Sequence, residues 1–339
     1  MHEPAFWHRP SSLLSRSLIP LGALYGAIAA RRMTRQGRDV GIPVLCVGNY
    51  HVGGAGKTPA TLALVQLLRG MGEVPVVLSR GYGGRLHGPV SVDPQRHSAA
   101  DVGDEPLMMA RAASVVVARD RVEGAALARS RNASVILMDD GFQNPAILKD
   151  ASLIVIDGDR ALGNGRVFPA GPLRAPLPPQ LARTDALVIV GPGVAAAEVA
   201  GAVAARGAPV LRAHLVPDAD SVARLQGSRV LAFAGIGNPA RFFATLRASG
   251  VDVVVERPFA DHHPFSRGEI EALMADAQRG GLTLVTTEKD LARIGPSPQD
   301  TAIVSLAVTM QFDDPAALRH FAADRLARAR AKKFRDGRP

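Results

Sequence analysis

Short apolar runs alternate with helix-like stretches from about residue 42 onward. Each run is four to six residues long and rich in Val, Ile and Leu, which predicts buried strands. The first series places strands at residues 42–47, 74–78, 114–117, 134–138, 153–156 and 186–190, with helices at 58–69 and 121–129. Buried strands that alternate with helices are typical of a parallel sheet with helices on both faces, so we expect an α/β fold.

A second series of strands and helices begins at residue 229. It predicts strands at residues 229–234, 251–256, 282–286 and 302–306, with one helix ending near 248 and another at 267–279. The stretch around Pro217 and Gly227 separates the two series, as a linker does. We therefore expect an N-terminal segment at residues 1–33, a larger domain at 34–220, and a smaller C-terminal α/β domain with a basic tail at 221–339.

The N-terminal segment carries an apolar stripe with helical spacing. One helix face is formed by Leu14, Leu18, Leu21, Tyr25 and Ile28. The charge-free stretch from Ser17 to Ala30 is too short to span a bilayer, which takes about 20 residues. Arginines flank the stretch on both sides, so we predict a helix that lies in a membrane interface.

Two alternatives stay open for this segment. The helix can pack on its own domain, or the segment can be a secretory signal, because Ala27-Ile28-Ala29 resembles a cleavage site. Pro20 and Gly22 interrupt the apolar run, and the ATP site inferred below requires the cytosol, so both observations argue against a signal.

The formal net charge of +9 is concentrated at the two ends of the chain. Residues 1–40 carry six Arg against two acids, a net +4, and residues 324–339 carry seven basic residues against two acids, a net +5. The body between them is neutral, so we expect no nucleic-acid partner. Basic ends indicate an anionic surface or solvated tails. The single cysteine, Cys46, excludes an intrachain disulfide and a zinc ribbon.

The strongest local motif is a glycine loop between a predicted strand and a predicted helix, His51-Val52-Gly53-Gly54-Ala55-Gly56-Lys57-Thr58. Glycines let successive backbone N–H groups converge on phosphate oxygens, and the helix N-terminus adds positive potential. In such a loop Lys57 reaches the β- and γ-phosphates, and the Thr58 hydroxyl binds Mg²⁺. His51 stands where the general pattern has glycine, and a chance glycine turn is the alternative.

Two carboxylates, Asp139 and Asp140, directly follow the strand predicted at residues 134–138. An acid at the end of a strand beside a phosphate loop is typical of nucleotide hydrolases and kinases. We expect at least one of the two to contact Mg²⁺, directly or through water; the alternative for the other is a helix or turn cap. The sequence contains no Asn-Lys-x-Asp pattern for guanine, so we expect ATP on a P-loop NTPase-like fold.

Several further motifs are too specific for generic loops. In chain order they are Ser79-Arg80-Gly81-Tyr82-Gly83-Gly84, Gly103-Asp104-Glu105-Pro106, Asp139-Asp140-Gly141-Phe142-Gln143, Gly163-Asn164-Gly165, Pro169-Ala170-Gly171-Pro172-Leu173-Arg174, Phe259-Ala260-Asp261-His262-His263 and Thr286-Thr287-Glu288-Lys289-Asp290. Together with the glycine loop, this series resembles the tetraacyldisaccharide 4′-kinase family of lipid A biosynthesis, over nearly the whole chain.

The resemblance implies a reaction and a location. Members transfer the γ-phosphate of ATP to the 4′-hydroxyl of tetraacyldisaccharide 1-phosphate, a lipid, with Mg²⁺ as cofactor. The product is the 1,4′-bisphosphate. The resemblance further implies a peripheral protein on the cytoplasmic face of the inner membrane, with its site between two domains. We expect it to contact the anionic membrane surface as a monomer.

The resemblance also assigns roles to individual residues. Asp104 matches the family's Gly-Asp-Glu motif and is the candidate base, His262 is its partner, and Lys57 acts on the phosphates. The alternative for Asp104 is a helix N-cap. Candidate substrate contacts are Arg80, Asn49, Gln143, Arg121 and Arg174, and surface ion pairing is the alternative for the three arginines.

Two departures from the family pattern are Ala175, where Glu is usual, and Asn144, where His is usual. If that Glu helps to hold Mg²⁺, restoring it at position 175 should lower the Mg²⁺ requirement. Two other functions remain as alternatives: another P-loop enzyme, such as a small-molecule kinase or a metallochaperone ATPase, and a peripheral membrane adaptor that binds nucleotide without chemistry.

Overall fold

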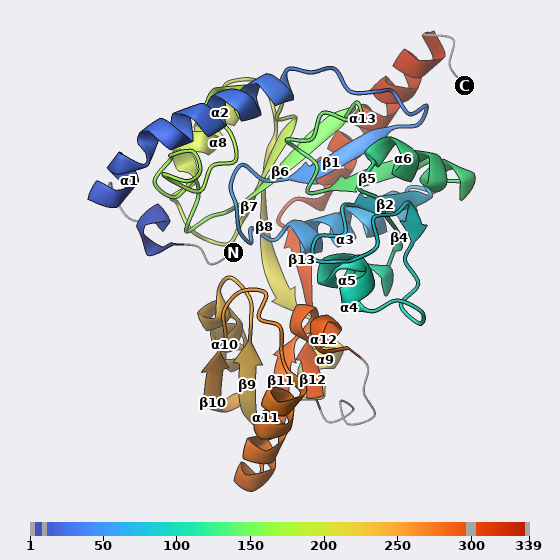
Figure 1. Cartoon of the computed structure of the whole chain (residues 1–339). Helices are drawn as coiled ribbons and strands as arrows, with labels where there is room; N and C mark the ends of the chain where they lie inside the picture. Colours follow the sequence, from blue (N-terminus) through green and yellow to red (C-terminus); the bar gives the residue numbers. More distant parts are fainter. Residues whose placement is uncertain (1–3, 9–11, 296–302, 336–339) are drawn as a thin grey trace.

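Nine strands form one sheet in the larger of two α/β units (Figure 1). The computed structural model describes residues 4–8, 12–295 and 303–335. In spatial order the strands are β13 (Val308–Phe312), β8 (Val210–Pro217), β7 (Ala186–Val190), β6 (Ala151–Asp157), β1 (Val44–Gly48), β5 (Val135–Asp139), β2 (Pro75–Ser79), β4 (Ser114–Val117) and β3 (Val90–Ser91).

The sheet is parallel from β8 to β4, which confirms the predicted α/β architecture. Each edge adds one antiparallel strand, since β3 pairs with β4 and β13 pairs with β8. Five central strands, β1, β2, β5, β6 and β7, are buried along their whole length, as expected for strands covered on both faces. The carboxyl ends of β1 and β5 are neighbours, because Val47 pairs with Asp139.

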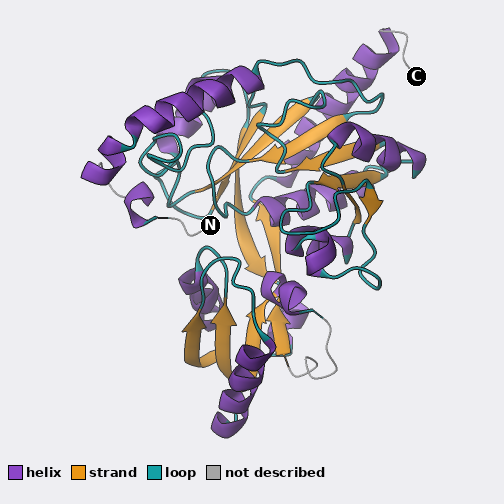
Figure 2. Cartoon of the chain, viewed as in Figure 1, coloured by secondary structure: helices purple, strands orange, loops and turns teal. Residues whose placement is uncertain are grey.

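Helices cover both faces of this sheet (Figure 2). One face packs against α3 (Lys57–Arg69), α5 (Asp104–Ala110) and α13 (Pro315–Arg335). The other packs against α6 (Arg121–Ser130), α8 (Ala197–Ala204) and the end of α2 (Ile19–Met33). Helix α3 shows why such helices form: Ala60, Leu64 and Leu68 recur every fourth residue and are fully buried. The short helices of this unit are η1 (Ala5–His8), α1 (Leu13–Ser17), α4 (Ala99–Val102) and α7 (Leu177–Leu181).

The smaller unit is a four-stranded parallel sheet. Its strands in spatial order are β10 (Asp252–Pro258), β9 (Arg229–Ala234), β11 (Thr283–Thr287) and β12 (Ile303–Leu306). Helix α10 (Pro239–Ala248) packs on one face and α11 (Arg267–Gly280) on the other, each with its own apolar cluster. Two short helices, α9 (Ala219–Ala223) and α12 (Glu288–Ile294), complete the unit.

The end of the chain corrects the expected division into domains. The range 221–339 was expected to form the smaller domain with a basic tail, but β13 joins the larger sheet and α13 contributes Leu318, Phe321 and Leu326 to the larger core. Two neighbouring strands, β8 and β13, therefore connect the units (Figure 1). The sequence pattern missed both because they lie at the sheet edge and are only partly buried.

The N-terminal helices lie along the larger unit with their small residues inward. Gly22 and Gly26 are buried, and a Cβ on Gly22 would stand 2.9 Å from the carbonyl oxygen of Val167. The large apolar residues point outward instead: Leu13, Leu14, Ile19, Leu21, Leu24, Tyr25 and Ile28 are all exposed. Packing on the domain and an exposed apolar stripe thus occur together, on opposite faces of one helix. Within the described residues, no helix combines the length and apolarity needed to cross a membrane.

Candidate active site

The glycine loop connects β1 to α3 at the carboxyl edge of the larger sheet. Gly53 and Gly56 have φ values of 109° and 86°, in the left-handed region that favours glycine. Nothing lies within 4 Å of a Cβ placed on Gly54, so the loop is open there. The Asn49 amide donates to the carbonyl oxygen of Gly53 at 3.2 Å, which ties the loop to the end of β1.

Two buried polar atoms in this loop region have no hydrogen-bond partner among the described residues, Asn49 Oδ1 and His51 Nε2. The His51 ring is bound on its other nitrogen, Nδ1, which lies 3.0 Å from the carbonyl oxygen of Val52. Burial lowers the pKa of His51 to about 4, so the ring is neutral at pH 7. Unpaired buried polar atoms beside an open glycine loop fit a bound nucleotide.

The two acids after β5 have different environments. Asp139 is buried, accepts a hydrogen bond from Thr61 Oγ1 at 3.4 Å, and has a pKa raised to about 7, first by burial and then by the charges of Glu105 and Asp140. Asp140 accepts two hydrogen bonds from Arg174, at 2.8 and 3.0 Å, and lies 3.8 Å from Lys57 Nζ. Burial alone would raise the pKa of Asp140, but Lys57 and Arg174 outweigh it and lower that pKa.

The chemistry of these residues fits a Mg²⁺ ion that is shared with a nucleotide. The described residues contain no cluster of three or more His, Cys, Asp or Glu side chains that would hold a metal alone. Mg²⁺ beside a triphosphate takes only one or two carboxylates, with phosphate oxygens and water for the rest. Asp139, Asp140 and the Thr58 hydroxyl fit that role, because both acids end the strand next to the loop.

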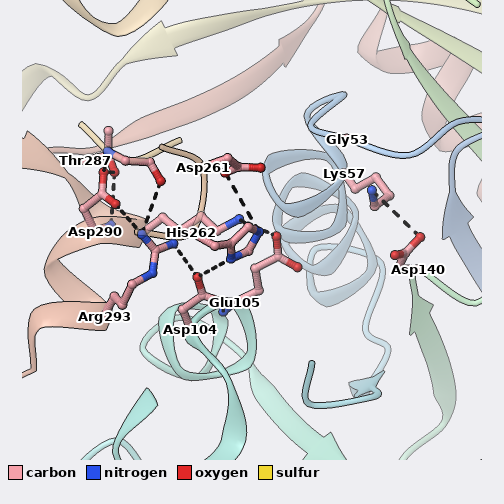
Figure 3. A network of polar contacts seen from close by, with 12 residues as sticks. Gly53, Lys57, Asp104, Glu105, Asp140, Asp261, His262, Thr287, Asp290 and Arg293 are labelled. Carbon is pink, nitrogen blue, oxygen red and sulfur yellow. Dashed lines mark hydrogen bonds and ion pairs between the residues drawn. The ribbon is translucent and has the colours of Figure 1, made fainter. Parts of the chain in front are cut away.

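A second group of polar side chains faces the loop from α5, α12 and the 259–263 loop of the smaller unit (Figure 3). Asp104 Oδ2 lies 3.3 Å from His262 Nδ1, so the structure brings the candidate base and its expected partner together. His262 has a φ of 58°, a strained conformation for a non-glycine residue, and its backbone N–H donates to the Gly235 carbonyl at 3.0 Å.

Cations of α12 surround the acids of α5. Lys289 Nζ donates to Glu105 Oε1 at 2.9 Å, and Arg293 Nη2 donates to Asp104 Oδ2 at 2.6 Å. Burial would raise the pKa of Asp104, but the hydrogen bond with His262 and the charges of Lys289 and Arg293 together hold that pKa well below its usual range. Asp104 is therefore ionised in the free protein. The alternative of a helix N-cap is wrong, because Gly103 is the N-cap of α5 and Asp104 is the first helical residue, whose Oδ1 accepts the N–H of Glu105.

The candidate substrate contacts are distributed unevenly around the loop. Arg174 contacts both Asp140 and the carbonyl oxygen of His51, at 3.0 Å. Arg121 is buried behind the loop and donates to the carbonyl oxygens of Ser79 and Ala118, so it is not a surface ion pair. Arg80 is exposed. Gln143 donates a hydrogen bond to the Asn49 carbonyl oxygen at 2.8 Å. Because the Asn49 side chain binds the Gly53 carbonyl oxygen, both residues support the glycine loop.

The two departures from the family pattern lie in different settings. Ala175 is fully buried in the core cluster on the α2 side of the sheet, and its carbonyl oxygen accepts a hydrogen bond from Gln180 at 2.8 Å. A glutamate at position 175 would place its side chain among buried apolar residues. We therefore expect Ala175→Glu not to improve Mg²⁺ binding. Asn144 is partly exposed, and its carbonyl oxygen accepts a hydrogen bond from Lys149.

One residue of this constellation, Arg293, escaped the sequence prediction. It binds Asp104 from a position 189 residues later in the chain. A signal was nevertheless present, because Lys289 and Arg293 are four residues apart and share one face of α12. In an arginine-rich chain that spacing alone did not distinguish Arg293 from solvated arginines.

A glycine loop at the carboxyl edge of a parallel sheet, with acids on the next strand and a carboxylate–imidazole pair opposite, is an arrangement suited to moving a phosphoryl group. The structure therefore defines a phosphate-loop ATP-dependent phosphotransferase. The family profile of tetraacyldisaccharide-1-P 4′-kinases matches residues 14–327. The chain belongs to this family.

Known relatives agree with that assignment. The chain is 68% identical over 336 residues to the tetraacyldisaccharide 4′-kinase of Rhodopseudomonas palustris strain BisB5, covering 98% of this chain and 99% of that protein. It is 67% identical over 334 residues to the enzyme of the same name from Nitrobacter winogradskyi, covering 97% and 99%. Its structure is similar to that of LpxK from Aquifex aeolicus in complex with ATP, with a TM-score of 0.71, 26% identity, and coverage of 93% of this chain and 100% of that one.

Proposed function

We propose that this chain transfers the γ-phosphate of ATP to the 4′-hydroxyl of tetraacyldisaccharide 1-phosphate and releases the 1,4′-bisphosphate lipid. Family membership supports the substrate. The observation that carries the chemistry is the 3.3 Å approach of Asp104 to His262, in the group of side chains that faces the glycine loop. A nucleotide-binding adaptor without chemistry needs no such pair.

On the ATP side, residues 51–58 hold the triphosphate through backbone N–H groups and the N-terminus of α3. Lys57 lies near Asp140 and reaches the β- and γ-phosphates from there. Thr58, Asp139 and Asp140 would hold Mg²⁺, which when bound would neutralise charge on the phosphates. Arg174 orients Asp140 and stays close enough to the loop to contact a phosphate oxygen.

On the acceptor side, Asp104 accepts the proton of the 4′-hydroxyl as its oxygen attacks the γ-phosphorus. His262 holds the carboxylate by a bond from Nδ1 and shares the proton. Phosphoryl transfer depends mainly on positioning and charge neutralisation, so a base in hydrogen-bond reach completes the requirement. Of the other candidate substrate contacts, Arg80 is exposed and can meet the acceptor, whereas Asn49, Gln143 and the buried Arg121 bind protein groups and support the site.

The membrane provides the lipid. The exposed apolar side chains of α1 and α2 enter the interface, and Arg31 and Arg32 contact anionic headgroups at the end of α2. The protein then acts as a peripheral monomer on the cytoplasmic face of the inner membrane. In this arrangement the larger unit with the phosphate loop and the smaller unit with His262 act as two domains that enclose the acceptor.

The direct test incubates the protein with γ-labelled ATP, Mg²⁺ and tetraacyldisaccharide 1-phosphate in mixed micelles, and separates the lipids. The wild type should give a labelled bisphosphate. Asp104→Asn should lose about 10²- to 10⁴-fold in rate while retaining ATP affinity. Asp252→Asn, an exposed carboxylate on β10, is the matched control and should behave as wild type. Unlabelled lipid with the wild type would overturn the function, and full activity of Asp104→Asn would overturn the base.

A further inference from the structure

The Thr286-Thr287-Glu288-Lys289-Asp290 motif lies at the start of α12, and no step above uses its last residue. Asp290 is completely buried. Its Oδ2 accepts hydrogen bonds from the Thr287 hydroxyl at 2.8 Å and from the Gly235 N–H at 3.0 Å. Its Oδ1 accepts a hydrogen bond from Arg293 Nη1 at 2.7 Å. A buried carboxylate that accepts several hydrogen bonds is itself held in place, so it fixes the position of the guanidinium of Arg293.

Arg293 connects this anchor to the reaction site. Its Nη2 donates to Asp104 Oδ2 at 2.6 Å, while its Nη1 also reaches the carbonyl oxygens of Gly235 and His263, at 3.2 and 3.4 Å. The Gly235 carbonyl accepts the N–H of His262 as well. One guanidinium therefore holds the carboxylate of Asp104 directly and the loop that carries His262 through its backbone (Figure 3).

The charged surroundings of Asp104 come from three elements. Helix α12 contributes Lys289 and Arg293, the 259–263 loop contributes Asp261 and His262, and α5 contributes Glu105. Glu105 is matched by Lys289 at 2.9 Å, and Asp261 Oδ1 lies 3.9 Å from His262 Nε2. Arg293 is the cation closest to Asp104, and its side chain is only 12% exposed, so solvent screens it weakly.

We propose that Arg293 is a positioning residue of the kinase, anchored by Asp290, which fixes Asp104 Oδ2 against His262 and holds that carboxylate ready for the proton of the substrate. The proposal rests on the proposed role of the Asp104–His262 pair. A planar fork that bridges two carboxylates and two carbonyls holds a geometry that a single ammonium cannot. A neighbouring cation also disfavours protonation of the Asp104 carboxylate.

The experiment compares Arg293→Gln, Arg293→Lys and Arg267→Gln in the full-length protein, with kcat and KM measured against pH. Arg267 is an exposed arginine paired with Glu271 on α11, so it serves as the matched control. Arg293→Gln should lower kcat about a hundredfold, because a small misplacement of reacting groups has that effect. KM for ATP should stay the same, since the phosphate loop lies on the other unit.

The pH profile separates positioning from a merely structural role. Without the cation, Asp104 takes up a proton more easily, so the acid limb of kcat/KM should move to higher pH by about one unit. Arg293→Lys keeps the charge and should leave the limb in place while kcat still falls. The control should match wild type in both.

Each result decides the proposal. A normal kcat for Arg293→Lys, or an unmoved acid limb for a folded Arg293→Gln, would overturn it. Thermal melts identify a variant that fails to fold. If Arg293→Gln does not fold, the test rests on Arg293→Lys, which should show a lower kcat and an acid limb at the wild-type pH. Failure of the underlying proposals looks different: wild type would leave the lipid unlabelled if the function were wrong, and Asp104→Asn would transfer phosphate normally if the base were wrong. An inactive Asp104→Asn beside a fully normal Arg293→Gln defeats the positioning role alone.

Discussion

The two basic ends of the chain have similar charge, +4 over residues 1–40 and +5 over residues 324–339, but the structure treats them in opposite ways. Helix α2 presents large apolar side chains to solvent and ends in the exposed Arg31 and Arg32. Helix α13 turns its cations toward acids of the larger unit instead. Lys333 lies 2.7 Å from Asp39, and Arg330 lies 2.6 Å from Glu73.

The difference shows that a charge count does not distinguish a surface for a partner from an internal contact. Arg325, Arg330 and Lys333 of α13 pair with acids of the larger unit, and Lys333 is buried between Asp39 and Asp150, at 2.7 and 3.7 Å. The cations of α2 lie beside apolar side chains that the described residues leave uncovered. Only the second arrangement is suited to an anionic membrane.

The largest effect should come from Lys333→Met. This change leaves Asp39 and Asp150 buried without their cation, and it should lower the free energy of unfolding by about 3–5 kcal/mol. Urea unfolding followed by circular dichroism measures it. The triple variant with Asp39→Asn and Asp150→Asn should recover much of the loss. A single variant as stable as wild type would show that α13 is a solvated tail after all.

The double change Leu21→Gln and Leu24→Gln should have the next largest effect. It should weaken membrane binding and leave the free energy of unfolding unchanged. Both side chains are more than half exposed, so folding stability should stay the same. Loss of about 3 kcal/mol of interfacial burial should weaken vesicle binding about a hundredfold. Flotation with vesicles containing anionic phospholipid measures binding, and Val194→Gln, exposed on the same unit, is the control. Unchanged flotation would remove the interfacial role of α2.

The double change Arg31→Gln and Arg32→Gln should weaken the same binding by about 1 kcal/mol for each residue. The effect should require anionic lipid and shrink at high salt, because exposed charges are screened. An effect of equal size on purely zwitterionic vesicles would argue that these arginines act by some means other than charge.

The smallest effect should come from Arg328→Gln on α13. Arg328 pairs with Asp324 at 2.8 Å one turn earlier, but its side chain is 70% exposed. Such surface pairs contribute about 0.3–0.5 kcal/mol, so the unfolding curve should barely move. A loss comparable to that of Lys333→Met would mean that burial does not separate the cations of this helix.

The sequence predicted those parts of the fold whose pattern is complete within a few residues. The strands at 114–117, 186–190 and 229–234 have the predicted bounds, because each is an uninterrupted apolar run. Strands β8 and β13 were missed because only some of their side chains are buried, and their pairing joins segments 93 residues apart at Thr309 and Val216.

The site shows the same limit. The glycine loop and the acids after β5 could be predicted because each motif is contiguous and its elements are adjacent in the sheet. Arg293 could not be predicted, because its role depends on its contact with Asp104. That contact forms only where the two units meet in the folded chain. The roles of Asp104, His262 and the other site residues stay predictions until the variants above are measured.

The return of the chain to the larger sheet has a consequence for synthesis. Strand β13 and the buried Lys333 follow the whole smaller unit in the chain, and Lys333 must meet Asp39, 294 positions earlier. The smaller unit is contiguous and can fold as it emerges, whereas the larger one stays open at its β8 edge until β13 has been translated. Truncated nascent chains would therefore expose that edge, a target for chaperones and proteases before the enzyme is complete.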